Sequence, residues 1–184
     1  MTFRKFLPLL GLLPALVAGR AAAQASINDW YTVALAASRN ATEQVQALLA
    51  DKFTDPDVLD GQSGRTALDF AASFNNLVMA QLLLDHGAHV DYRDRLGNSA
   101  LHYAAERSNL DMMRLRIKNG ATLDFPNKQG ITPIMIAADQ GQPAAVRLLL
   151  QSGADPKKQD FTGRDAFGWA AGKPAVVQAL NTKR

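Results

Sequence analysis

The sequence predicts an all-α repeat solenoid, a stack of helix-turn-helix units joined by finger turns. Three features recur with a period of 33 residues: a glycine before each helix pair, a glycine after it, and an alanine pair in the first helix. A unit of this length cannot bury its apolar face alone, so its copies stack into one elongated core. Since the outer surfaces of such a stack stay free, binding is the predicted function.

The repeating residues place each element. The leading glycines are Gly64, Gly97, Gly130 and Gly163, the closing glycines are Gly87, Gly120 and Gly153, and the alanine pairs are Ala71–Ala72, Ala104–Ala105, Ala137–Ala138 and Ala170–Ala171. Small alanine side chains let the first helices of neighbouring units lie close together. The second helices carry leucine runs, at 82–84 and 148–150, that fill the layer between units. The closing glycine ends each second helix in the left-handed conformation.

These features divide the chain into about five units behind a leader. A degenerate first repeat is expected at residues 28–60, full repeats at 61–93, 94–126 and 127–159, and a truncated capping repeat at 160–184. Terminal repeats depart from the pattern because they cover an apolar interface with a polar outer face. Trp30 and Trp169 lie in these caps and are expected to cover the stack ends.

Residues 1–25 have the layout of an export signal. Arg4 and Lys5 precede an apolar stretch at 6–18, and small residues allow cleavage after Ala23 or Ala25. A membrane anchor is the alternative, but the stretch is shorter than the roughly 20 apolar residues that span a bilayer. We therefore expect the periplasm, or secretion, with no membrane contact after cleavage; the export route stays open.

Charge and cysteine content exclude several classes. The net charge is +3, and the first twenty residues hold three of the 20 basic residues and no acid, which leaves 17 basic against 17 acidic residues. Beyond Lys157 and Lys158 no basic cluster appears, so no nucleic-acid partner is expected. The absence of cysteine excludes thiol catalysis, thiolate metal sites and disulfides, and stability must come from packing.

The repeating pattern resembles the ankyrin repeat, with three units that match well and a degenerate copy at each end. The resemblance is carried by Gly97, Ala100, Leu101, His102, Ala104 and Ala105 in one unit, and by Gly130, Thr132, Pro133, Ala137, Ala138, Gly153, Ala154 and Asp155 in the next. It implies a concave groove, lined by finger turns and first helices, that binds another protein by preorganised complementarity. We expect a monomer that needs no cofactor.

The resemblance implies which side chains face this groove. The candidate protein-binding residues are Arg65, Phe74, Arg93, Arg95, Asn98, Glu106, Arg107, Lys128, Ile131, Asp139, Gln140, Phe161 and Arg164. Five of them are expected to be anchors, because arginine and aromatic residues dominate interface hot spots. These five are Arg65, Phe74, Arg95, Arg107 and Phe161. For each, a solvated surface residue is the alternative. Tyr92 and Phe125, 33 residues apart, are expected to pack between units.

Arg116 breaks the pattern, because it stands where neighbouring units have Leu83 and Leu149. We expect its guanidinium to reach solvent on the convex side or to pair with Glu106 or Asp111, since an unpaired buried charge is costly.

No catalytic or metal-binding constellation is evident. His102 is expected to bridge a loop to a helix, and His86 and His89 lack the further ligands that a zinc site requires. The turn residues Asp94 and Asp160 are expected to close Asx turns. The predicted function is thus a non-catalytic scaffold, and the resemblance to secreted bacterial ankyrin proteins implies one that assists or protects a periplasmic enzyme. An inhibitor or immunity-type protein is the main alternative, and a hydrolytic or metal-dependent enzyme is a remote one.

Overall fold

The computed structural model describes residues 33–181 and shows a helical stack without strands over that range. A short helical segment at 33–38 precedes the labelled helices. These are α2 (Thr42–Leu49), α3 (Ala67–Ser73), α4 (Leu77–Asp85), α5 (Ala100–Glu106), α6 (Leu110–Lys118), α7 (Pro133–Asp139), α8 (Pro143–Ser152), α9 (Ala166–Trp169) and α10 (Pro174–Leu180). The predicted solenoid is confirmed.

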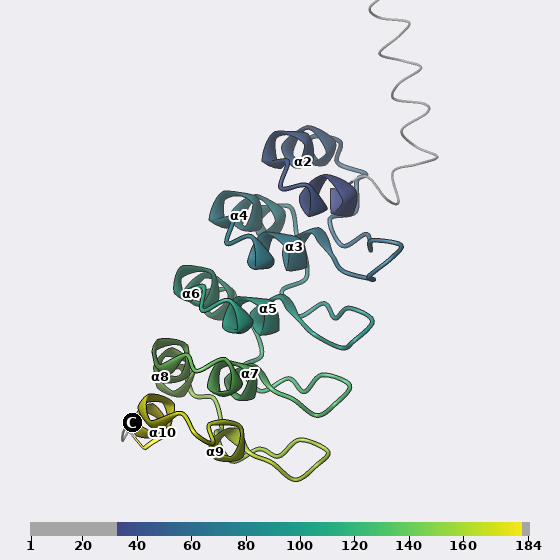
Figure 1. Ribbon diagram of the computed structural model, residues 1–184. Helices are drawn as coiled ribbons and strands as arrows, with labels where there is room; N and C mark the ends of the chain where they lie inside the picture. The colour runs from purple at the N-terminus through teal and green to yellow at the C-terminus, as the bar shows by residue number, and fades with distance from the viewer. Residues whose placement is uncertain (1–32, 182–184) are drawn as a thin grey trace, which may run out of the picture.

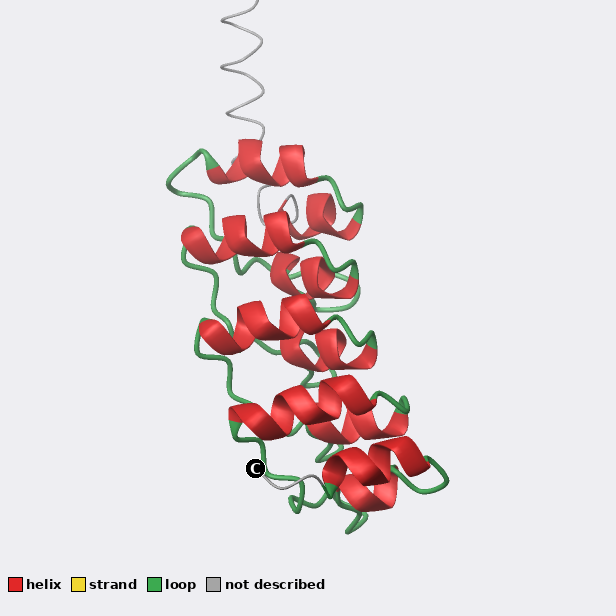
Figure 2. Cartoon of the chain, turned by 90° about the vertical axis from the view of Figure 1, so that its left-hand side faces the viewer, coloured by secondary structure: helices red, strands yellow, loops and turns green. Residues whose placement is uncertain are grey.

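Three layers run along the stack. Helices α3, α5, α7 and α9 form an inner layer, with the outer helices on one side and the finger turns projecting on the other (Figure 1). Figure 2 looks onto the outer layer and shows its helices lying one beside the next. Each inner helix packs on the inner helix of the neighbouring unit, which makes one continuous core.

The inner helices begin at equivalent polar residues. Thr66, Ser99, Thr132 and Asp165 stand at 33-residue steps just before them. At the first, the Thr66 N–H donates to Asp69 Oδ2 at 2.8 Å, and the Asp69 N–H donates back to Thr66 Oγ1 at 3.2 Å. Such a capping box satisfies two amides that a helix start leaves open.

The small residues lie where the period places them. The alanine pairs of α3, α5 and α7 are fully buried, as predicted. The fourth pair differs: α9 ends at Trp169, so both alanines lie in the following turn, where Ala170 is buried and Ala171 is exposed. Leu83 and Leu149 are also fully buried and fill the layer between units, whereas Leu82, Leu84 and Leu148 of the same runs are only partly buried.

The leading glycines serve contacts between fingers. A Cβ built on Gly97 would lie 2.8 Å from the Lys128 backbone nitrogen, and one on Gly130 would lie 2.8 Å from that of Phe161. Each finger therefore rests against the glycine of the preceding finger. Gly163, in the last finger, has no such neighbour.

The predicted leader, its cleavage sites and Trp30 lie outside the described residues. Within residues 33–181, no helix is long and apolar enough to cross a membrane.

Candidate protein-binding face

The finger turns are closed by side chains that point inward. Asp94 Oδ1 accepts hydrogen bonds from the backbone of Leu96 and Asn98, both at 2.8 Å. Asn127 and Asp160 accept equivalent bonds, which confirms the predicted Asx turns. In the first finger Asp60 fills this role, one residue before Gly61, because that turn is one residue longer. The side-chain oxygens of these turn residues therefore already accept hydrogen bonds from within the chain.

Hydrogen bonds join the fingers into one row. The Lys128 N–H donates to Leu96 O at 2.9 Å, and the Phe161 N–H donates to Gln129 O at 3.2 Å. Between the first two fingers a side chain makes the link: the Arg95 guanidinium donates to Gly61 O and Gln62 O, each at 2.8 Å. The row holds its side chains at fixed positions before any partner binds.

Some arginines of the predicted binding face stack on aromatic rings of the chain itself. The Arg65 guanidinium lies 4.3 Å from the Phe70 ring centre and 3.9 Å from that of Tyr103. It also donates to Asp69 O and to Ser73 Oγ. Arg65 is only partly exposed and is held within the chain, so its structural role is the stronger one. Sequence reasoning missed this because Tyr103 belongs to the next repeat.

Similar stacking occurs at two further places. The Arg93 guanidinium lies 4.1 Å from the Phe125 ring centre, so Phe125 does pack between units, whereas Tyr92 is more exposed than predicted, at 37%. Arg164 lies 3.8 Å from the Trp169 ring centre, and the indole N–H donates to Asp160 at 3.1 Å. These contacts hold the Trp169 ring against the finger turn of its own unit.

The structure brings six of the thirteen predicted residues into two rows. Arg95, Lys128 and Phe161 occupy one repeat position at the finger tips, and Phe74, Arg107 and Gln140 occupy another at the ends of α3, α5 and α7. The exposed members of the predicted set are Phe74, Arg93, Arg95, Glu106, Arg107, Lys128, Asp139, Gln140, Phe161 and Arg164. Asn98 and Ile131 are half-buried: Asn98 Oδ1 accepts a bond from Asn127, and Ile131 O faces His102 Nε2. Leu96, 64% exposed, joins the finger tips beside Arg95.

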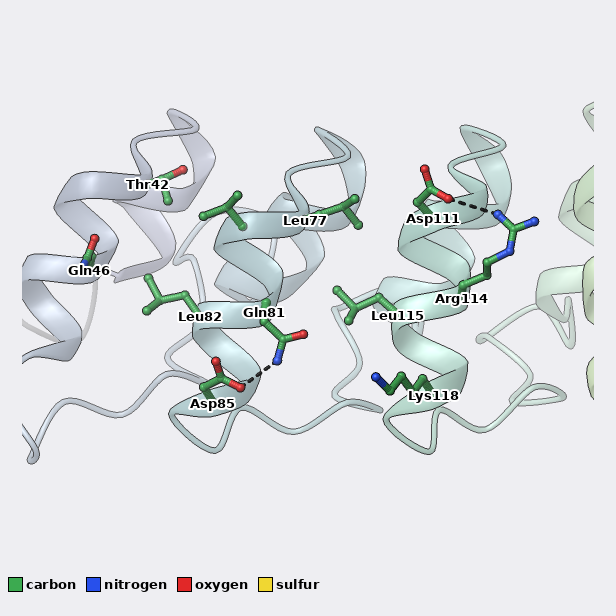
Figure 3. Close-up of a pocket in the computed structure, with 11 residues that line it drawn as sticks. Thr42, Gln46, Leu77, Gln81, Leu82, Asp85, Asp111, Arg114, Leu115 and Lys118 are labelled. Carbon is green, nitrogen blue, oxygen red and sulfur yellow. Dashed lines mark hydrogen bonds and ion pairs between the residues drawn. The ribbon is translucent and has the colours of Figure 1, made fainter.

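An open hollow of about 740 Å³ lies on the outer layer, over α2, α4 and α6. Figure 3 shows its apolar lining from Leu77, Leu82 and Leu115. The rim of the hollow is polar (Figure 3). There Arg114 forms an ion pair with Asp111 at 3.1 Å, and Gln81 donates a hydrogen bond to Asp85 at 2.7 Å. Val78, 71% exposed, also lines it, and nothing in the leucine-rich sequence of α4 signalled that exposure.

Arg116 contradicts the expectation of a solvated or acid-paired guanidinium. Its side chain is 0% exposed, and its hydrogen bond, at 2.7 Å, goes to Val90 O rather than to Glu106 or Asp111. Nε and Nη1 have no hydrogen-bond partner among the described residues. Burial lowers the pKa of Arg116 to about 10. Attraction to the carboxylates of Asp69, Asp91 and Asp57, of which Asp69 has the largest effect, raises the pKa in the opposite direction. The prediction failed because units pack on both faces of α6 and enclose the whole side chain.

The histidines have structural contacts. The Ser99 N–H donates to His102 Nδ1 at 3.1 Å and Nε2 faces Ile131 O at 3.2 Å, which confirms the predicted bridge from loop to helix. Burial lowers the pKa of His102 to about 4, so its ring is neutral at pH 7. His86 contacts Leu82 O, and the His89 ring bonds to Asp57. No group of three metal-ligating side chains occurs in residues 33–181.

We predict that His89 makes stability pH-dependent. Its hydrogen bond to Asp57 raises the pKa of the imidazole, so its stabilising effect is complete below about pH 6.5 and is lost as pH rises through the folded-state pKa. At the equivalent position of the next repeat, Thr122 donates its backbone N–H and its hydroxyl to the carboxylate of Asp91. His89→Thr should therefore keep the bond without the titration. The melting-temperature difference between wild type and variant should shrink from about pH 5.5 to about pH 8.5; a constant difference would contradict this.

Together the stacked helical hairpins, the finger row and the exposed face define a helical repeat solenoid. The family model described as ankyrin repeats (3 copies) matches residues 10–94, 33–124, 91–160 and 115–181. The chain belongs to the ankyrin repeat family, whose general role is that of a non-catalytic protein-interaction scaffold. No curated protein matches the chain significantly.

Proposed function

We propose that this protein is an exported scaffold that binds a partner protein through its finger tips and the ends of its inner helices, and that it assists or protects a periplasmic enzyme. One observation supports this choice of binding face: large apolar side chains are exposed along it, next to arginines. Leu96 is 64% exposed, Phe161 is 78% exposed, and Phe74 is exposed at the end of α3. Exposed apolar groups gathered on one face favour protein contact.

The rigidity of the face supports binding by preorganisation. Hydrogen bonds between fingers, and the Arg65 stack between Phe70 and Tyr103, hold the surface without a partner. Side chains that are already placed lose less entropy on binding, so more of the contact energy appears as affinity.

The test is capture of the partner from a periplasmic extract by the folded chain, with identification by mass spectrometry. Changing Phe74, Leu96, Arg107 and Phe161 together to alanine should weaken the recovered complex about tenfold or more, because hot-spot truncations cost about 2 kcal/mol each. The matched control is Val78→Ala with Arg147→Ala, two exposed residues of the outer helices. Unchanged binding by the first variant, with its helical content intact, would refute the proposed face.

The same complex separates the proposed roles. A partner enzyme that keeps its activity and survives oxidant or heat longer in the complex supports assistance, whereas stoichiometric loss of activity supports an inhibitor. Export is tested separately by the first residue of the mature chain, which should be Gln24 or Ser26.

A further inference from the structure

The exposed charges along one edge of the later fingers are all of one sign, whereas the base of the last finger also carries the exposed Asp155. The finger edge is defined here as residues 92–98, 125–131 and 157–164. Its exposed charged residues are Arg93, Arg95, Lys128, Lys157, Lys158 and Arg164. Its two acids, Asp94 and Asp160, are buried and hold the turns. Because basic and acidic residues balance after the first twenty, this edge is a local excess of positive charge.

Five of these six cations have no carboxylate within ion-pair distance among the described residues, and Lys158 donates only to the carbonyl oxygen of Asp124, at 3.4 Å. The Lys128 and Lys157 ammonium groups make no hydrogen bond there, and Arg95 donates to the carbonyl oxygens of Gly61 and Gln62, which are uncharged. Arg93 lies on the Phe125 ring, also uncharged. Their charges are therefore available to an incoming anion, unlike that of Arg164, which lies 3.5 Å from Asp160.

Apolar groups stand among these charges. Arg95, Lys128 and Phe161 follow one another along the tips, and hydrogen bonds between fingers set their spacing. Leu96 projects beside Arg95 and is 64% exposed, and Phe161 ends the row at 78% exposed. A complementary ligand would carry carboxylates and apolar side chains together along an extended segment.

We propose that the finger edge binds an acidic protein segment, with carboxylates against Arg93, Arg95, Lys128 and Lys157 and an apolar side chain against Leu96 or Phe161. The inference rests on the proposed function and specifies the chemistry of the partner. Charge complementarity of this kind sets specificity and association rate. The exposed apolar groups favour protein over nucleic acid, for which we would expect several stacking aromatics along a basic groove.

The probe is a fluorescein-labelled peptide of glutamates interrupted by phenylalanines, titrated by fluorescence anisotropy at about 20 mM salt, where screening is weak. We expect binding that weakens as salt rises. Lys128→Glu with Lys157→Glu should weaken it about tenfold or more. The control, Lys118→Glu with Arg147→Glu, makes the same change in net charge on the outer helices and should change binding less than about twofold. Phe161→Ala should weaken this peptide but not an all-glutamate one.

Three outcomes would overturn the inference: no binding by wild type, equal weakening by both charge-reversal pairs, or tighter binding of a single-stranded DNA of equal length that depends on the same lysines. Its failure is distinguishable from that of the proposed function. The natural partner's binding could depend on Phe74 and Leu96 but change neither with salt nor with the Lys128→Glu, Lys157→Glu variant. That result would support the scaffold function and contradict an acidic ligand.

Discussion

Gly97→Ala is expected to lower the free energy of unfolding by about 3–5 kcal/mol, whereas Gly120→Ala should lower it by only about 1–2 kcal/mol. Both glycines have a φ of 82°, so the cost of placing alanine in a left-handed conformation is shared. They differ in their surroundings. A Cβ on Gly97 would lie 2.8 Å from the Lys128 backbone nitrogen, and one on Gly120 would meet nothing within 4 Å.

The difference between these variants isolates the contact between fingers. To accept the methyl group at Gly97, the third finger must move away and strain the bond from Lys128 N–H to Leu96 O. Urea unfolding followed by circular dichroism measures both values. Equal losses would mean that backbone conformation alone, and not packing between fingers, accounts for the leading glycines.

Arg116→Leu is expected to raise the free energy of unfolding by about 1–3 kcal/mol, as happens when buried ionic groups are replaced by apolar ones. The variant restores the residue type of Leu83 and Leu149, which are fully buried in the neighbouring units. It removes a buried charge with two nitrogens that lack hydrogen-bond partners among the described residues. Arg114→Leu, at an exposed site on the same helix, is the control and should change stability by less than about 0.5 kcal/mol.

The increase in the free energy of unfolding caused by Arg116→Leu should be larger at about pH 5 than at about pH 8. Burial raises the pKa of Asp69 to about 7, so the folded chain holds this proton more tightly than the unfolded chain and loses stability as pH rises from about 4 to about 7. Arg116 attracts the ionised Asp69, and without it the pKa of Asp69 rises further, so ionisation costs more at high pH. Destabilisation by Arg116→Leu at both pH values would show that the guanidinium stabilises the layer.

Most of the architecture was predictable from the sequence. Repeated polar residues and glycines specify local geometry, so they predicted the turn carboxylates at Asp94 and Asp160 and the ends of the second helices. The alanine pair at Ala170–Ala171 was half wrong, because α9 is too short to bury both residues.

The binding face was only partly predictable. Arg65 looked like a free anchor, but its ring partner Tyr103 lies 38 residues ahead and only stacking brings them together. The positive finger edge was missed for a similar reason: its charges come from three fingers that lie far apart in the sequence, so no run longer than Lys157–Lys158 appears.

The sequence by itself determined the period, the order of helices and turns, and which small residues lie inside, because these depend on local conformation and on apolar positions that repeat. Tertiary structure decided which polar groups remain for a partner. Stacking buried Arg116, held Arg65 between two rings and aligned Arg95 with Lys128. Burial and alignment of this kind depend on contacts between neighbouring repeats, which no single repeat encodes.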